Sequence, residues 1–310
     1  YISIARAGYR QYLEAFFQLY PGFIHVISGF LPVSFELSGL FISHFAFVCG
    51  LILFWKLASV EKNVNPRWSM IFLLIYPVSF FFAAAYTTSL YFFLAAGTFY
   101  AAKKRHWVIA GTLGFLASAT QIFGVFLCIG LILEYMQSKK KKHIDWLWIL
   151  LVPLGLVTYM VYLWQTRGDP LAFYHVQPAF GAARSAESLI LLPQVIWRYL
   201  KIVFLASPYT FPYVISLFEL TSFVGSLCLL WIGYKKKVSL SYLFYAGAVM
   251  ILPTLTGTLS SFPRYLLSAF PLFFIFGMIQ SVYVKILLSV IFFLGLVLFC
   301  SAFLQGYFVS

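Results

Sequence analysis

The sequence predicts an all-α polytopic membrane protein, because its composition is apolar throughout and its apolar runs recur at membrane-spanning length. Its 310 residues are 63% hydrophobic and 9% charged, whereas an average soluble domain carries roughly 25% charged residues. Runs of about 17–25 apolar residues, the length that a helix needs to cross roughly 30 Å of hydrocarbon, occur from end to end. We therefore expect a single membrane-embedded domain over residues 1–310, with about 9–11 transmembrane or re-entrant helices.

Ten apolar stretches of 14 to 22 residues are candidate crossings, because each carries few or no charges. In chain order they are Leu40–Leu57, Ser69–Tyr86, Ser89–Ala102, Trp107–Thr120, Ile122–Tyr135, Trp146–Trp164, Tyr213–Tyr234, Leu240–Leu259, Arg264–Gln280 and Ile286–Leu304.

Two further apolar segments are interrupted and are expected to be in-plane or re-entrant helices on the outer side. Phe16–Phe35 contains Pro21 and Pro32, which disfavour a continuous helix. It belongs to an outer first loop with in-plane helices over residues 1–36. Leu189–Ala206 is interrupted by proline and by two cations. It belongs to an outer loop with an interfacial helix over residues 165–212.

Basic residues near the ends of these stretches predict the orientation of the chain, since cytoplasmic loops of membrane proteins are enriched in Lys and Arg. An even number of predicted crossings separates successive clusters, so all of them can lie in the cytoplasm. The net charge of +13 reflects these clusters and predicts no nucleic-acid partner. The clusters are Lys56/Lys62/Arg67, Lys103–Arg105, Lys139–Lys142, Lys235–Lys237 and Lys285.

Two polar hairpin tips face the other side in this arrangement. "AAAYTTS" (Ala83–Ser89) contains Tyr86, and "ATQIFG" (Ala119–Gly124) contains Gln121. The second hairpin is short, with about 22 Å for each arm. Non-helical backbone below the membrane surface is tolerated only beside protein or a water-filled cavity. The tips therefore predict a polar, partly submerged cavity on the outer side.

The most polar stretch of the chain, "TRGDPLAFYHVQPAF" (Thr166–Phe180), is expected on the same side. It brings Arg167, Asp169, His175 and Gln177 together between two apolar blocks. Carboxylates can act as general bases, and guanidinium groups bind phosphate through paired hydrogen bonds. Such a set suits transfer of a group from a phosphate-bearing lipid to a hydroxyl.

Each candidate also has a purely structural interpretation, and both stay open. Asp169 precedes Pro170 and can initiate a turn. Arg264 lies in the first turn of an apolar stretch, where it can anchor the helix at the membrane surface. Gln121 can form a hydrogen bond between helices, and His175 can sit at an interface without any chemical role.

The usual signatures of soluble-nucleotide and metal chemistry are absent from the sequence. There is no Walker loop, no HExxH and no GxSxG. The four cysteines fall inside apolar runs and lack metal-ligand spacing. We therefore predict no cofactor and no metal site. An activated donor that is itself a lipid needs neither.

Four segments, taken in order, resemble one known family of membrane enzymes. They are "YISIARAGYRQYLEAFFQLYP", "YPVSFFFAAAYTTSLYFFLAAGTFYAAKKRHWVIAGTLGFLASATQIFG", "GDPLAFYHVQ" and "SSFPRYLLSAFPLF". Together they resemble PIG-V-like (GPI mannosyltransferase II-like) glycosyltransferases over nearly the whole chain.

The resemblance implies a GT-C-type fold and inverting transfer of mannose from a polyprenyl-phosphate or dolichyl-phosphate donor. The family's catalytic Asp belongs to a Trp-Asp pair expected before Tyr1, so the chain is expected to be N-terminally truncated. Glu14 is the nearest remaining acid in that loop. The chain departs from the family pattern at Gln18, where Pro is usual, at Thr88, where Glu is frequent, and at Gln121, where Arg is common.

The resulting hypothesis is a glycosyltransferase in which a carboxylate of the outer loop accepts the proton of the acceptor hydroxyl. Glu14 is the second choice for this base, after the family's Asp expected before Tyr1. Arg264, assisted by Arg198 and Lys201, is expected to bind the donor phosphate. The expected partners are the lipid bilayer, the lipid-linked donor and a glycan, glycolipid or protein acceptor. The side chains expected to contact sugar or acceptor are Asp169, Gln177, His175, Gln121 and Tyr86.

The expected location is a multi-pass position in a bacterial plasma membrane or in the endoplasmic reticulum, with the site on the extracytoplasmic face. A eukaryotic member of the family would act in GPI-anchor assembly. Two alternatives remain at this point. The same polar groups could serve a transporter or flippase of a lipid-linked saccharide, or the chain could be an inactive member of the family.

Overall fold

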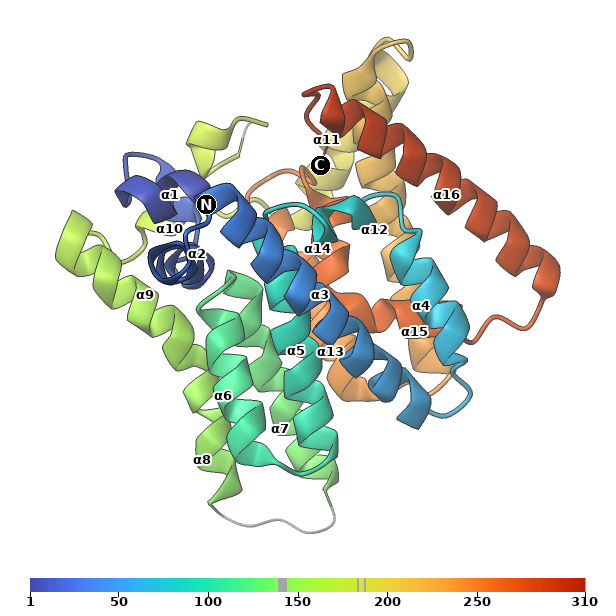
Figure 1. Ribbon diagram of the computed structural model, residues 1–310. Helices are drawn as coiled ribbons and strands as arrows, with labels where there is room; N and C mark the ends of the chain where they lie inside the picture. Colours follow the sequence, from blue (N-terminus) through green and yellow to red (C-terminus); the bar gives the residue numbers. More distant parts are fainter. Residues whose placement is uncertain (139–143, 183, 187, 310) are drawn as a thin grey trace. The chain divides into compact units, whose positions relative to one another are not determined.

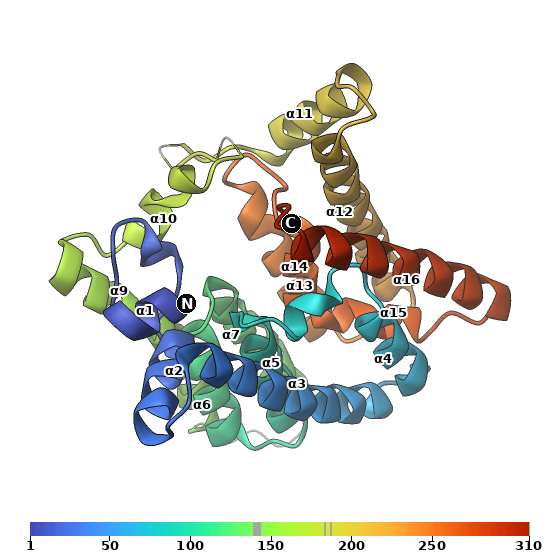
Figure 2. The same ribbon diagram turned by 45° about the horizontal axis from the view of Figure 1, so that its top comes forward.

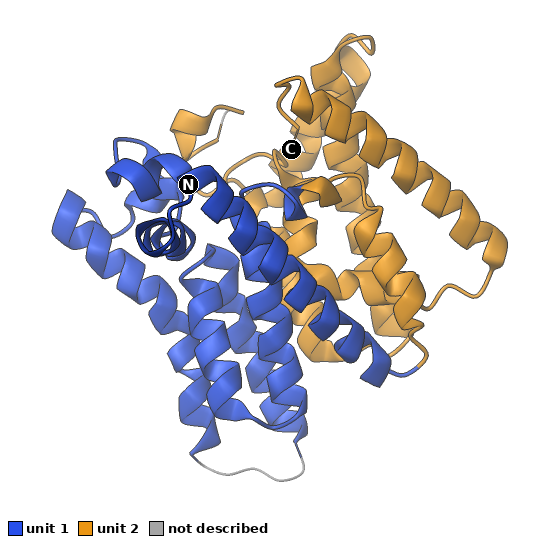
Figure 3. Cartoon of the chain, in the orientation of Figure 1, with its two compact units in different colours: residues 1–62, 81–176 blue, residues 63–80, 177–310 orange. Residues whose placement is uncertain are grey.

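The computed structural model describes residues 1–138, 144–182, 184–186 and 188–309. These residues form helices and connecting turns, with no β-strand among them (Figure 1). They divide into two compact units (Figure 3): the first unit is residues 1–62 and 81–176, and the second is residues 63–80 and 177–310. The predicted all-α polytopic membrane class is confirmed.

Four helices of the described chain are long and apolar enough to cross a membrane. Each covers a predicted crossing. Two begin with a serine whose hydroxyl accepts an N–H of the first turn, Ser34 from Leu37 and Ser281 from Val284. The four are α3 (Phe35–Val60), α8 and α9 taken together (Asp145–Ile149 and Leu151–Arg167), α12 (Phe211–Lys235) and α16 (Val282–Leu304).

In the first unit, α3 packs on α5, α5 on α6, and α6 on α9. Gly155 of α9 lies so close to the carbonyl oxygen of Phe115 in α6 that no side chain fits between them. The remaining helical elements of this unit are α1 (Ile2–Ala7), η1 (Leu13–Ala15), α2 (Leu19–Phe30), α5 (Thr87–Lys103), α6 (Trp107–Ser118), η3 (Ile122–Phe126), α7 (Leu127–Gln137) and α10 (Ala172–His175).

Of the two prolines expected to interrupt Phe16–Phe35, Pro21 leaves the helix α2 intact, whereas Pro32 lies in the break between α2 and α3. Pro21 lies in the first turn of α2, where the missing N–H has no partner inside the helix anyway. Pro32 follows the end of the helix.

In the second unit, α11 runs antiparallel to the first half of α12, and Figures 1 and 2 show the two side by side. The Tyr213 hydroxyl donates to the carbonyl oxygen of Val203 near the turn that joins them. The in-plane and re-entrant alternatives for Leu189–Ala206 both stay predictions. The other elements are α4 (Pro66–Leu74), η4 (Gln177–Phe180), α11 (Leu192–Leu205), α13 (Leu240–Thr254), α14 (Phe262–Ser268), η5 (Phe270–Leu272) and α15 (Phe273–Phe276).

Three predicted crossings are broken or shortened at a proline. Ser69–Tyr86 was expected to be continuous, but α4 ends at Leu74, before Pro77, and the chain resumes in η2 (Ser79–Phe82) at the boundary of the units. Arg264–Gln280 is divided by Pro271 among α14, η5 and α15. In Leu240–Leu259, the helix α13 ends at Thr254, one residue after Pro253. Proline lacks the N–H that a helix needs and clashes with the preceding turn.

Within each unit, the described lysine clusters gather at one end of the helices. In the first, Lys103 Nζ lies 3.1 Å from Glu61 Oε1 and 3.0 Å from Glu134 Oε1. In the second, Lys236 Nζ donates to the carbonyl oxygen of Met278 at 2.8 Å, and Lys285 lies over the ring of Trp68. The expected cluster Lys139–Lys142 lies outside the described residues.

Candidate functional site

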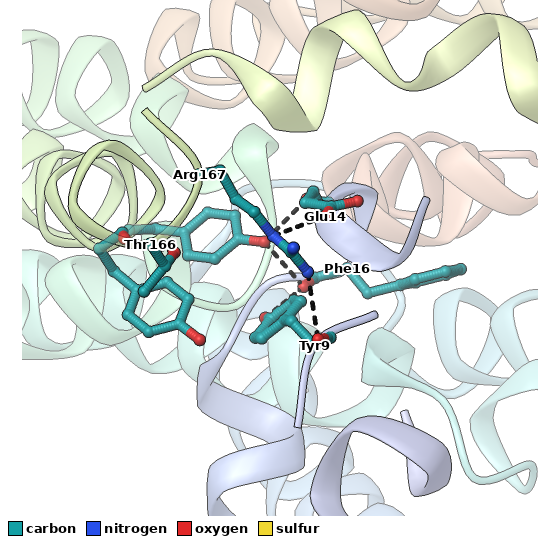
Figure 4. Close-up of polar contacts among 7 residues, drawn as sticks. Tyr9, Glu14, Phe16, Thr166 and Arg167 are labelled. Carbon is teal, nitrogen blue, oxygen red and sulfur yellow. Dashed lines mark hydrogen bonds and ion pairs between the residues drawn. The ribbon is translucent and has the colours of Figure 1, made fainter. Parts of the chain in front are cut away.

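A buried carboxylate in the first unit pairs with an arginine from a distant part of the chain. Glu14, in η1, is 4% exposed, and its Oε1 lies 3.0 Å from Nε of Arg167, the last residue of α9. The Arg167 Nη2 also donates to the carbonyl oxygen of Tyr9 at 3.1 Å. Figure 4 shows the guanidinium between Glu14 and Tyr9. The guanidinium thus holds the acid in one orientation and compensates its charge.

Tyrosines fix the backbone around this pair. The Tyr159 hydroxyl of α9 donates to the carbonyl oxygens of Glu14, at 2.7 Å, and Phe16, at 3.2 Å. The Tyr9 hydroxyl donates to the carbonyl oxygen of Phe16 at 2.6 Å. Burial raises the pKa of Tyr9, and the neighbouring Tyr159 raises it further. Phe17 and Tyr159 belong to a buried cluster with Phe173 of α10 beneath the loop. The loop that carries Glu14 is therefore held firmly against α9 and α10.

The second carboxylate oxygen of Glu14 has a different environment. Oε2 is buried and has no hydrogen-bond partner among the described residues. A buried polar atom without a partner is costly. Because Arg167 engages Oε1, Oε2 is the oxygen left to accept a proton or a hydrogen bond from a hydroxyl.

The tips of the two predicted hairpins meet in the first unit. Gln121 Nε2 donates to Thr87 Oγ1 at 2.8 Å, and the Tyr1 hydroxyl lies 3.2 Å from the same oxygen. The ring of Tyr86 lies edge-on to that of Tyr1. The hydrogen bond expected from the structural interpretation of Gln121 is thus present. Its partner is Thr87 at the start of α5.

Asp169 and His175 form a local pair after the end of α9. Asp169 Oδ2 lies 2.7 Å from His175 Nδ1, and Asp169 Oδ1 accepts the N–H of Leu171 at 2.9 Å. The turn expected at Asp169–Pro170 is thus present. The hydrogen bond from His175 lowers the pKa of Asp169.

Gln177, expected beside these residues, belongs to the second unit, where it begins η4. Its Oε1 accepts a hydrogen bond from Arg184 Nη1 at 3.2 Å. The polar stretch of the sequence is therefore shared between the two units and is not a single cluster within one of them.

The three cations expected at the donor phosphate all lie in the second unit. Arg198 Nη1 donates to the carbonyl oxygen of Gly257 at 3.3 Å. Arg264, in α14, lies near the ring of Tyr265. Both arginines adjoin the segment of residues 255–261, which connects α13 and α14. Arg198 contacts this segment, and Arg264 follows it in the chain. Lys201 instead lies over the ring of Trp197, its neighbour on α11.

A hydrogen-bonded network that the sequence analysis did not include among the candidates lies beside this segment. The Glu219 carboxylate of α12 is 3% exposed and accepts the Tyr199 hydroxyl at 2.6 Å through Oε2. Its Oε1 accepts the N–H of Ser261 at 3.2 Å. A carboxylate inside an apolar run was the available signal, because an acid in a membrane helix is costly unless it is paired.

Within each unit, the candidate residues lie at the helix ends away from the described lysine clusters. In the first unit, Thr87 begins α5 and Lys103 ends it. In the second, Glu219 lies in the first half of α12 and Lys235 ends it. Among the described residues, no group of three or more His, Cys, Asp or Glu is placed to hold a metal ion. The described residues therefore offer two sets of groups. The first unit holds a buried carboxylate with one oxygen that has no hydrogen-bond partner among them, and the second holds arginines beside a buried loop.

No family model, curated protein or solved structure matches the chain. The likeness to PIG-V-like enzymes stays a prediction from the four sequence segments.

Proposed function

We propose that the chain is an inverting glycosyltransferase of the PIG-V-like, GT-C type, which moves a sugar from a polyprenyl-phosphate donor to a hydroxyl. The sugar is mannose by the family resemblance, and the acceptor is a glycan, glycolipid or protein on the extracytoplasmic face. The observation that carries the proposal is the Glu14 carboxylate, which is buried and oriented by Arg167 through one oxygen while the other has no partner among the described residues.

The proposed reaction is a single displacement at the anomeric carbon. The acceptor oxygen forms a bond to that carbon as the bond from the carbon to the phosphate oxygen breaks. The polyprenyl phosphate leaves with the electron pair of the broken bond, and the hydroxyl proton passes to Glu14 Oε2. Attack opposite the leaving group inverts the configuration of the sugar.

The surroundings of Glu14 support a role as base. Arg167 Nε and the Tyr159 hydroxyl fix the carboxylate and its backbone, so the acid is held in place before any substrate arrives. Tyr86, Gln121, Asp169 and His175 supply rings, an amide and a carboxylate in the same unit, all groups of the kind that contact sugars. For the second unit, we propose separately that Arg264, with Arg198 or Lys201, binds the phosphate of a polyprenyl lipid.

The test is transfer of radiolabelled mannose from polyprenyl-phosphate mannose by the full-length protein and its Glu14→Gln variant. Gln can still accept a hydrogen bond from Arg167 but cannot take the proton. We expect the variant to lose on the order of a hundredfold or more in kcat, the usual contribution of a general base, with little change in the KM for the donor.

The matched control is Glu36→Gln. Glu36 is also paired with an arginine, with Oε1 2.7 Å from Arg6 Nη2, but its side chain is half exposed. It should retain full turnover. Equal kcat for wild type and the Glu14→Gln variant would remove Glu14 from the reaction. If the protein moves the intact lipid-linked sugar across the membrane without transferring it, the chain is a flippase and not a glycosyltransferase.

A further inference from the structure

The buried acid of α12 is tied to the segment that leads into α14. Glu219 accepts two hydrogen bonds, from the Tyr199 side chain of α11 and from the backbone N–H of Ser261. Both donors are buried. One side chain of α12 thus bridges a neighbouring helix and a loop 42 positions further along the chain.

The same loop is held at several further points. The Tyr199 hydroxyl also accepts the N–H of Leu259 at 3.1 Å and lies 3.2 Å from Thr258 Oγ1. Thr258 Oγ1 in turn accepts the N–H of Ser260 at 3.1 Å. Within this segment, the N–H groups of Leu259, Ser260 and Ser261 are therefore satisfied by side chains rather than by a helix.

Ser261 has an unusual backbone conformation at the point where α14 starts. Its φ is 66°, in the left-handed region, and its own side chain makes no capping hydrogen bond to α14. A residue other than glycine adopts this conformation at a cost and keeps it only where its surroundings hold it. The Glu219 carboxylate provides such a hold on the Ser261 N–H. Arg264 lies three residues later, inside α14.

An acid is a costly choice at this position. Glu219 lies in a helix long and apolar enough to cross the membrane, where an apolar side chain would avoid the cost of burying a carboxylate. The hydrogen bond to Ser261 is what an apolar residue could not provide.

We propose that Glu219 is a positioning residue for Arg264: it holds Ser261 in the left-handed conformation and so fixes the start of α14. The arginine is thereby presented to the monophosphate of a polyprenyl lipid. The proposal rests on the proposed function for the identity of that phosphate. Glu219 itself touches neither donor nor acceptor.

The first measurement is amide hydrogen exchange across residues 257–262 of the purified full-length protein. In Glu219→Leu, which removes the acceptor but suits an apolar helix, exchange in this segment should rise at least tenfold, because a buried hydrogen bond is lost. Glu219→Gln keeps an acceptor oxygen and should stay close to wild type. The matched control is Thr221→Val, since Thr221 lies on the same helix and its hydroxyl, among the described residues, donates to carbonyl oxygens of α12 itself.

The second measurement is binding of undecaprenyl monophosphate, without sugar, in lipid nanodiscs. Arg264→Ala should weaken binding on the order of tenfold or more by removing a charge-assisted contact. Glu219→Leu should weaken it by a smaller factor, and Glu219→Gln should restore it. In the double variant Glu219→Leu/Arg264→Ala, the loss should equal that of Arg264→Ala alone, because the acid acts only through the arginine.

The outcomes separate this inference from the proposed function. Unchanged exchange in Glu219→Leu, or independent losses that multiply in the double variant, would overturn the positioning role even if the chain transfers sugar. No binding of the lipid phosphate by the wild type would contradict the proposed function and the phosphate half of the inference. The exchange result would still decide whether Glu219 holds the loop.

Discussion

At the scale of single residues, the buried acids Glu14 and Glu219 are each held by side chains or backbone groups of other elements. Glu14 is a candidate because it lies in the expected outer first loop, yet Arg167, more than 150 positions away, could not be assigned to it without the fold. Glu219 can be recognised in the sequence as an acid in an apolar run, but its partners Tyr199 and Ser261 cannot be assigned to it from the sequence. By contrast, the turn at Asp169–Pro170 is local and was predictable from the two residues themselves.

The Asp169–His175 pair leads to a pH prediction at this scale. Hydrogen bonding to His175 lowers the pKa of Asp169 in the folded chain, below the value of about 4 for an unfolded chain. The stabilisation is therefore present above about pH 4 and is lost as the pH falls through the folded pKa. Both side chains are more than a third exposed, so we expect less than about 1 kcal/mol.

The measurement is the thermal unfolding midpoint of wild type and Asp169→Asn in detergent, between about pH 6 and pH 2.5. Asn can still accept the N–H of Leu171, and the variant removes the charge together with the acceptor for His175. Wild type should unfold at the higher temperature at pH 6, and the difference should vanish at the acid end. A difference that stays constant or widens in acid would show that the charge of Asp169 does not stabilise the fold.

At the scale of elements, apolar length predicts helices well where no proline intervenes. The crossings expected at Leu40–Leu57 and Ile286–Leu304 are covered by α3 and α16. The stretches through Pro77 and Pro271 were predicted as continuous and are divided. Their composition is apolar throughout, but apolarity does not supply the hydrogen bond that proline removes. Length and hydropathy therefore predicted burial in these stretches better than they predicted continuity.

Helix packing in the first unit makes a sharp prediction at Gly155. A Cβ at this position would collide with the carbonyl oxygen of Phe115 and with Ser118, so α6 and α9 would have to separate. We expect Gly155→Ala to destabilise the chain by about 1–3 kcal/mol, the usual cost of overpacking. The measurement is the thermal unfolding midpoint in detergent.

Gly225→Ala is the control for this prediction. Gly225 lies in α12 with no atom within 4 Å of an added Cβ, and alanine favours a helix over glycine by about 0.5–1 kcal/mol. It should be neutral or stabilising. If Gly155→Ala is as stable as Gly225→Ala, α6 and α9 do not approach each other as closely as described.

At the scale of the whole molecule, the lysine pattern predicted that lysine clusters and candidate residues lie at opposite ends, and this holds inside each unit. Lys103 with Glu61 and Glu134 marks one end of the first unit, and Lys236 and Lys285 mark one end of the second. The candidate acids lie at the other ends. The division into two compact units was not foreseen, because nothing in the polar stretch 166–180 marks a boundary between His175 and Gln177. The side of the membrane that each end faces stays a prediction from the lysines.

Thiol accessibility in intact cells tests this central claim most directly. Single cysteines would replace Asp169 and Lys62 in the first unit, and Ser207 and Lys237 in the second, in a chain whose own four cysteines have been replaced by alanine. We predict that a membrane-impermeant maleimide labels Asp169→Cys and Ser207→Cys in intact cells, and Lys62→Cys and Lys237→Cys only after permeabilisation. Labelling of Asp169→Cys and Ser207→Cys from opposite sides of the membrane would contradict the account. So would labelling of Asp169→Cys from the same side as Lys62→Cys, or of Ser207→Cys from the same side as Lys237→Cys.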